Sequence, residues 1–203
     1  MIAVITGDIV NSEQYSSSIW MPLLKKVLKK YGEQPEIWDI YRGDEFQIKI
    51  SPLVALEAAI QLKAMIKSVN NLDVRIAIGI GDETYSGGRI TEANGSAYKR
   101  SGRMFETLKE EKRTLALASG NETQDNILNL MIKLALDFMD DWSPVSANTV
   151  AWTLQHPESS QQAMASHFKI QQSAVSQRQK RARMYLLQEL LEFYKQSIKQ
   201  IAP

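Results

Sequence analysis

Apolar residues recur along this chain at two spacings, and the spacings predict an alternation of strands and helices. Alternating or β-branched apolar runs, which are typical of strands, occupy residues 2–5, 37–40, 46–50, 74–81 and 114–118. Apolar residues three and four positions apart, which are typical of amphipathic helices, occupy residues 20–31, 52–69 and 90–108. The predicted order up to residue 118 is therefore β-α-β-β-α-β-α-β.

The first six of these elements follow the βαββαβ plan, in which helices pack on one face of an antiparallel sheet. We therefore expect an α+β fold that begins with a ferredoxin-like domain. In this plan the end of the first strand lies beside the hairpin that joins the second and third strands. Asp8, at the end of the first predicted strand, and Asp44, in the hairpin, are therefore expected to meet across neighbouring strands.

The rest of the chain is predicted to be helical. A helix at 121–142 has a wide apolar arc, which indicates burial on more than one side, either between two domains or across a dimer interface. The run Asp140-Asp141-Trp142-Ser143-Pro144 ends this helix and predicts a boundary between domains 1–142 and 143–203. Further helices are expected at 146–154, from Ser159 or Ser160 to 168, at 171–183 and onward to 198. The last one would pack on the preceding helices or pair with a second copy.

Composition and charge narrow the class of protein. The 203 residues include no cysteine, which excludes disulfides and thiolate metal sites. No apolar run approaches the roughly 18–20 residues of a membrane span, and no basic segment of a signal peptide precedes residues 1–5, so we expect a cytoplasmic protein without a membrane partner. Residues 1–155 hold 17 Lys and Arg against 20 Asp and Glu, net −3, whereas residues 156–203 hold 7 against 3, net +4. This asymmetry indicates an anionic partner for the basic end or, alternatively, a solvated surface helix.

Candidate chemistry centres on the predicted hairpin turn, Tyr41-Arg42-Gly43-Asp44-Glu45-Phe46. Gly43 can adopt a positive φ, so the turn would present carboxylates and backbone N–H groups at one point. An acidic turn of this kind is often only solvated surface. Asp8 supplies a second carboxylate, and two carboxylates that close repel each other unless a cation lies between them. The pair therefore predicts a site for Mg²⁺, or Mn²⁺, together with bound phosphates.

Three segments together resemble the palm domain of the nucleotidyl cyclase superfamily, which includes class III adenylate and guanylate cyclases and diguanylate cyclases. They are Gly7-Asp8-Ile9-Val10, Arg42-Gly43-Asp44-Glu45-Phe46 and Arg75-Ile76-Ala77-Ile78-Gly79. The resemblance implies that Asp8, the Ile9 carbonyl and Asp44 hold the metal ions and that the two aspartates are catalytic. It also implies that Arg42 and Gly43 lie against the nucleotide phosphates, although diguanylate cyclases have a glycine at the position of Arg42.

The predicted third helix adds basic residues. Gly95-Ser96-Ala97-Tyr98-Lys99-Arg100-Ser101-Gly102-Arg103-Met104 resembles the cyclase segment Gly-x-x-Val-Asn-x-Ala-Ala-Arg-Leu, which implies that Arg103 steadies the triphosphate. Lys99 stands where cyclases have the asparagine that orients the ribose, and it can neutralise phosphate only as a flexible point charge. Because Lys99 and Arg103 share a helix face at i, i+4, both are expected to contact a nucleotide and, by the resemblance, to be catalytic. The alternative is a basic solvated face.

Residues 161–177 resemble the bacterial helix-turn-helix. Small Ala165 would let two helices cross closely, Ile170 would plug the turn, and Val175 would anchor the second helix, while Lys169 replaces the usual turn glycine. The second helix offers polar residues for base edges and cations for phosphates, namely Gln171, Gln172, Ser173, Ser176, Gln177, Arg178, Lys180 and Arg181. A helical hairpin used for protein contacts is the alternative.

A palm-like domain that opens with Ile-Thr-Gly-Asp-Ile-Val and precedes a helix-turn-helix resembles the SatD family of small bacterial proteins. We therefore expect a DNA-binding regulatory protein whose first domain binds a phosphorylated nucleotide and Mg²⁺, and a homodimer would suit both parts. The alternative is an active nucleotidyl cyclase, or a related nucleotidyltransferase, with an appended helix-turn-helix. In a third interpretation the first domain is a scaffold, and its two aspartates only hydrogen-bond the hairpin.

Overall fold

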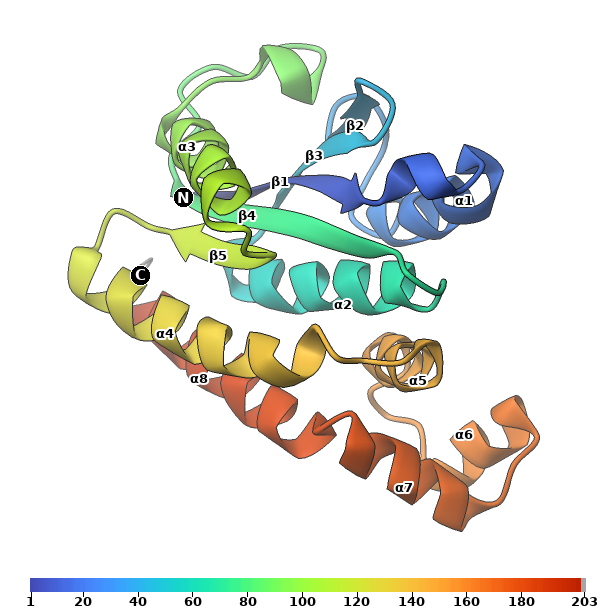
Figure 1. Cartoon of the computed structure of the whole chain (residues 1–203). Helices are drawn as coiled ribbons and strands as arrows, with labels where there is room; N and C mark the ends of the chain where they lie inside the picture. The colour runs from blue at the N-terminus through green and yellow to red at the C-terminus, as the bar shows by residue number, and fades with distance from the viewer. Residues whose placement is uncertain (202–203) are drawn as a thin grey trace.

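The computed structural model describes residues 1–201 and has an α+β architecture, as predicted (Figure 1). The strands are β1 (Ile2–Val10), β2 (Trp38–Tyr41), β3 (Glu45–Ile50), β4 (Asp73–Gly81) and β5 (Leu115–Ala118). The α-helices are α1 (Ser17–Leu28), α2 (Ala55–Lys67), α3 (Ser96–Glu111), α4 (Glu122–Met139), α5 (Pro144–Gln155), α6 (Gln161–Phe168), α7 (Gln172–Arg181) and α8 (Met184–Ile201). Short 3-10 helices are η1 (Ser12–Gln14), η2 (Pro52–Val54) and η3 (Ile90–Glu92). Within this range no helix has both the length and the apolar character needed to cross a membrane.

The long strand β1 lies at the centre of a mixed five-stranded sheet. The strand order is β2-β3-β1-β4-β5, and only the β4–β5 pair is parallel. β1 is paired along both edges, so that Thr6 lies opposite Gln47 of β3 on one side and Ala77 of β4 on the other. This double pairing fixes which side chains of β1 point to each face of the sheet.

Helices cover both faces of the sheet. α1 and α2 lie on the face where Ile5 and Ile9 are buried, as the βαββαβ plan predicts. α3 lies on the opposite face, where Phe105 packs in one cluster with Ala77 (Figure 1). The close approach of α3 depends on Gly79, because a Cβ atom there would collide with the backbone of α3. α3 packs on β1, β4 and β5, whereas the short 3-10 helix η3 lies next to β2 and β3.

The two largest departures from the predicted boundaries are the end of β1 and the start of α3, and each has a physical reason. β1 continues to Val10, so Asp8 lies inside the strand rather than at its exit. The polar residues Thr6 and Asp8 do not end the strand, because Ser101 and Arg75 provide them with polar partners. The third helix begins at Ser96 rather than at residue 90, because the chain from β4 to Gly95, which has a φ of 153°, forms an irregular loop.

The C-terminal helices share the main apolar core with the sheet. Val150 on α5 and Leu187 on α8 belong to the same buried cluster as Ile5 and Val74 of the sheet. Tyr194 on α8 is also buried, and its hydroxyl donates to the carbonyl of Pro52 at 2.7 Å. A new helix begins immediately after residue 143, but the apolar cores on the two sides of that residue are continuous.

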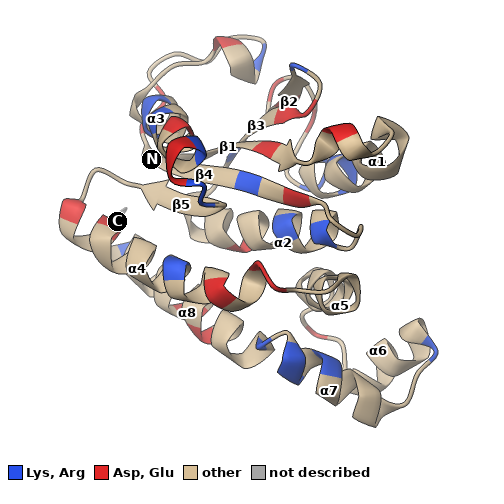
Figure 2. Ribbon diagram, in the orientation of Figure 1, with Lys and Arg blue, Asp and Glu red and all other residues tan. Residues whose placement is uncertain are grey.

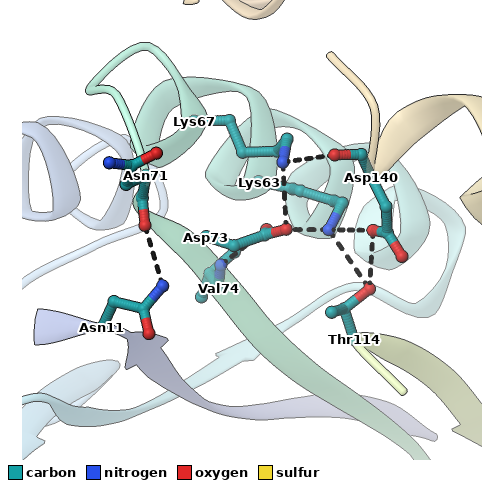
Figure 3. Close-up of polar contacts among 8 residues, drawn as sticks. All are labelled: Asn11, Lys63, Lys67, Asn71, Asp73, Val74, Thr114 and Asp140. Carbon is teal, nitrogen blue, oxygen red and sulfur yellow. Dashed lines mark hydrogen bonds and ion pairs between the residues drawn. The ribbon is translucent and has the colours of Figure 1, made fainter. Parts of the chain in front are cut away.

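A buried lysine ties the sheet to the end of α4 (Figure 3). Lys63 on α2 has a side chain that is 1% exposed, and its Nζ lies 2.7 Å from Asp73 Oδ1 and 2.6 Å from Asp140 Oδ1. Lys67, one turn later, lies 3.1 Å from Asp73 Oδ2 and donates to the carbonyl of Asp140 at 2.7 Å. Thr114 also donates to Asp140, so three elements converge on the point where α4 ends.

The variant Lys63→Met keeps most of the side-chain length but leaves Asp73 and Asp140 without their shared ammonium group. We expect the free energy of unfolding to fall by about 1.5–3 kcal/mol, because Asp73 and Asp140 lose the charged hydrogen bonds of Lys63, although Lys67 still pairs with Asp73. Urea denaturation at neutral pH measures the change. Lys195→Met, which breaks a partly exposed pair with Glu57, is the matched control and should cost less than about 1 kcal/mol. Equal losses in the two variants would contradict the importance of the buried network.

Candidate functional site

Polar side chains gather on the face of the sheet that carries α3. Side chains alternate along a strand, so Thr6 and Asp8 point to this face, whereas Ile5 and Ile9 point into the core. Gln47 on β3 confirms the direction, because its Nε2 donates to Thr6 Oγ1 at 3.2 Å. By strand register, the same face receives Asp39, Tyr41, Glu45, Lys49 and Arg75 from the neighbouring strands.

One carboxylate oxygen of Asp8 is paired and the other is not. Its Oδ2 accepts a hydrogen bond from Arg75 Nη1 at 3.0 Å, across the β1–β4 pair. Its Oδ1 is buried and has no hydrogen-bond partner among residues 1–201. Burial raises the pKa of Asp8 above the usual 3.8; Arg75 and Lys109 oppose this effect, and the charges of Asp44 and Glu45 add to it. The buried oxygen therefore favours either a proton or a cation as its partner.

The hairpin turn holds Asp44 close to the same place. Arg42 and Gly43 have φ values of 50° and 88°, so the expected positive φ of Gly43 is present and Arg42 shares it. Asp44 Oδ2 accepts a hydrogen bond from Ser12 Oγ at 2.5 Å, which draws the carboxylate toward the end of β1. Ser12 lies two residues after the end of β1, so the hairpin turn and the end of β1 are neighbours, as the predicted topology requires. The charge of Asp44 is one of the causes that raise the pKa of Asp8.

The basic residues of α3 differ in their position relative to these carboxylates. Lys99 and Arg103 are exposed on α3, and neither forms an ion pair within residues 1–201. Lys109, farther along the helix, places its Nζ 3.4 Å from Glu45 Oε1 and 4.3 Å from the centre of the Phe105 ring. Lys109 is therefore the residue of α3 that pairs with a carboxylate of the hairpin, whereas Lys99 and Arg103 are exposed to solvent.

A pocket of about 400 Å³ adjoins the hairpin on the same face, and η3 lies next to β2 and β3 there (Figure 1). It is lined by Asp39, Ile40, Tyr41, Arg42, Gln47, Arg89 and Thr91. Asp39 is buried and accepts a hydrogen bond from Arg89 Nη2 at 2.6 Å. Burial alone would raise the pKa of Asp39, but hydrogen bonds from Gln34, Arg89 and its neighbouring backbone N–H lower it. Asp39 thus stays ionised and positions the half-exposed guanidinium of Arg89 at the pocket.

The donor set of this site fits a hard cation that keeps water or phosphate ligands. Among residues 1–201, no group of three or more His, Cys, Asp and Glu is arranged to hold a metal ion. Asp8 and Asp44 offer two carboxylates, and Ile9, whose side chain is buried in the core, can offer only its carbonyl. Mg²⁺ is typically held by one or two carboxylates and completes its shell with water and phosphate oxygens. The residues therefore fit Mg²⁺ or Mn²⁺ and do not fit zinc.

α6 and α7 form a second candidate site, which projects beyond α5 (Figure 1). Ala165 and Val175 are buried together and Ile170 packs against them, as the packing pattern predicts. Lys169 has a φ of 54°, so it adopts in the turn the left-handed conformation that glycine usually supplies. α7 begins one residue later and ends two residues earlier than predicted, at Gln172 and Arg181.

The surface of α7 is polar and basic (Figure 2). Of the residues predicted to contact DNA, seven are exposed: Gln171, Gln172, Ser173, Ser176, Gln177, Lys180 and Arg181. Arg178 is only half-exposed, because its guanidinium lies 5.6 Å from the centre of the Phe168 ring. Arg178 therefore also helps to pack α6 on α7. No acidic residue occurs between Ser159 and Gln188, so nothing in this segment opposes an anionic partner.

Three residues around Asp8 and the hairpin carboxylates were not assigned to the site from the sequence: Ser12, Arg75 and Lys109. Arg75 had a usable signal, because it is a charged residue in a largely apolar strand and lies on the side of Asp8 once the register is known. Ser12 and Lys109 had no such signal. The segment after β1 brings Ser12 to the site, and the end of α3 brings Lys109 there.

Comparison of the chain with protein-family models, with curated proteins and with solved structures gives no match. Two surfaces of the molecule therefore carry the evidence for its function. We call Asp8, Asp44 and Glu45 with the adjoining pocket the carboxylate site, and the exposed residues of α7 the α7 surface.

The variant Asp8→Asn should make stability less sensitive to pH. A carboxyl group with a raised pKa stabilises the fold while it is protonated, and this contribution is lost as pH rises from 3.8 through the raised pKa. The natural protein should therefore lose free energy of unfolding over that window relative to Asp8→Asn, which cannot ionise. Denaturant titrations at a series of pH values measure the difference, with the exposed Asp141→Asn as control. A difference that does not change with pH would contradict the raised pKa.

Proposed function

We propose that this protein is a DNA-binding regulator whose sheet face binds a phosphorylated nucleotide together with Mg²⁺. The observation that carries the proposal is the α6–α7 pair, in which a tightly packed turn presents a polar and basic helix surface. Exposed glutamine and serine side chains can donate to and accept from base edges in a major groove. Lys180 and Arg181, farther along α7, can neutralise phosphates.

The nucleotide part of the proposal rests on the carboxylate site. A divalent cation would satisfy the buried Oδ1 of Asp8 and relieve its repulsion with Asp44. Phosphates carried by that cation would lie near the hairpin, where Arg42 and Arg89 line the adjoining pocket. Arg89 is held in place by the buried Asp39, so little conformational freedom is lost when it binds an anion.

The fold is compatible with both parts. The strand order β2-β3-β1-β4 and the antiparallel pairing of these strands support a ferredoxin-like, palm-like plan for residues 1–142. The α6–α7 packing supports a helix-turn-helix plan for the helices after residue 143. Catalysis has less support than binding, because Lys99 stands where cyclases have the asparagine that orients the ribose. Incubation with each nucleoside triphosphate and Mn²⁺ would reveal a cyclase or nucleotidyltransferase through a product that Asp44→Asn abolishes.

Binding of Mn²⁺ in the presence of nucleoside triphosphates should depend on both aspartates. We expect Asp8→Asn and Asp44→Asn each to weaken binding by at least about tenfold, because each removes a charged ligand. Lower pH should also weaken binding by the natural protein, since a proton competes for Asp8. Titration followed by Mn²⁺ electron paramagnetic resonance measures the affinity, and Asp141→Asn should bind as the natural protein does. Unchanged affinity in both variants would reject the carboxylate site as the cation site.

The variant Arg181→Ala should weaken binding to duplex DNA about equally for all sequences. We expect the slope of log affinity against log salt concentration to decrease by about 1, because one phosphate contact is lost. Fluorescence anisotropy with genomic fragments over a series of salt concentrations measures both effects. Lys199→Ala, which removes an exposed charge near the end of α8, is the control and should bind normally. Absence of DNA binding at low salt, or identical binding by Arg181→Ala, would reject this part of the proposal.

A further inference from the structure

An apolar ridge on α4 is exposed to solvent. Ile127, Leu130 and Leu134 are 41%, 59% and 66% exposed, and they follow one another at spacings of three and four residues. They therefore form one stripe along the helix, opposite the residues that face the core. The wide apolar arc predicted for this helix is present, but only the side with Leu128, Ile132 and Leu136 is buried in the core.

A groove of about 620 Å³ runs beside this ridge, between α4 and α8. Its walls are largely apolar, with Met131, Leu134, Ala135 and Phe138 from α4 and Leu186, Leu190 and Phe193 from α8. Leu186 and Phe193 are each 38% exposed. α4 lies against β5 at the edge of the sheet, and α8 lies beside α4 and contacts α2 (Figure 1). The ridge and the groove thus form one continuous apolar face, which we call the α4–α8 face.

The size of the α4–α8 face exceeds what scattered surface residues produce. Five large side chains that are between about a third and two-thirds exposed contribute several hundred Å² of contiguous apolar surface, which on monomers marks an interaction site. Two such faces placed together would bury on the order of 1,000 Å² in total, which is the area that a specific interface requires.

The α4–α8 face has features that suit contact with a second copy of itself. It carries a protruding ridge and a groove side by side, so the ridge of each copy can occupy the groove of the other in a two-fold arrangement. Its rim carries charges of both signs, Arg183, Asp137 and Glu189, and none of the three forms an ion pair within residues 1–201. A two-fold contact can therefore pair opposite charges, whereas a uniformly charged rim would repel a second copy.

We propose that two copies of this chain associate through the α4–α8 face, with α4 and α8 of each copy packed on those of the other. The proposal does not depend on nucleotide or DNA binding, since it rests on the exposed apolar area, the groove and the charges of the rim. Association would nevertheless bring two α7 surfaces into one dimer, because α7 is followed directly by α8, which lies in the proposed interface. Two such helices can contact paired half-sites on DNA.

Sedimentation velocity of the full chain over a wide concentration range tests the proposal. The natural protein should sediment as a dimer, and Leu134→Glu should raise the dimer dissociation constant by about 30-fold or more, because truncation or charging of a central apolar side chain costs at least about 2 kcal/mol. Circular dichroism should show unchanged helix content, since the side chain of Leu134 is largely exposed. Ile19→Glu, at an apolar residue of α1 that is 45% exposed, is the matched control and should leave the dimer intact.

The charged residues of the rim provide a second test. Recovery of the dimer in a double variant cannot be explained by a misfolded chain. Arg183→Glu should weaken the dimer, and the double variant Arg183→Glu with Glu189→Arg should recover part of the affinity, because opposite charges can again face each other. A chain that is monomeric at every concentration overturns the proposal. A dimer that Leu134→Glu and Arg183→Glu leave unchanged also overturns it, since the copies would then meet through another surface.

Discussion

The pairing of β1 along both of its edges is the constraint on which the carboxylate site depends. Its register with β3 and β4 places Asp8 opposite Arg75 and on the same face as Glu45. A slip of one residue would turn Asp8 into the apolar core and Ile9 toward the polar face, so the burial of Ile5 and Ile9 enforces the register. The apolar core on one face of the sheet therefore determines which polar side chains lie on the other face.

The same core extends into the helical half of the chain and joins it to the sheet. α5 and α8 bury their apolar sides against α2, and Lys63 holds the end of α4 through Asp140 and the start of β4 through Asp73. Arg75, which pairs with Asp8, lies only two residues beyond Asp73 on β4. The sheet, α5 and α8 thus share one core, whereas the buried residues of α6 and α7 form a small cluster of their own.

Periodicity and topology together were sufficient to predict much of this arrangement. The strand and helix order and the packing of Ala165, Ile170 and Val175 follow from local spacing, and the structure has both. Topology predicts that the hairpin lies beside the end of β1, where Ser12 bonds Asp44. The end of β1 and the start of α3 could not be predicted, because partners distant in sequence decide them. Lys109 and the Asp39–Arg89 pair were missed for the same reason, since a helix end and a long loop bring them to the sheet.

The central claim is that Asp8 and Asp44 share a divalent cation on the polar face of the sheet. A crystal soaked with Mn²⁺ and a nucleoside triphosphate, measured for anomalous scattering at the manganese edge, tests it most directly. The account predicts a peak about 2.1 Å from the buried Oδ1 of Asp8, within coordination distance of Asp44 and in contact with phosphate oxygens. A protein that binds Mn²⁺ and nucleotide elsewhere, with both carboxylates left as they are, would contradict it.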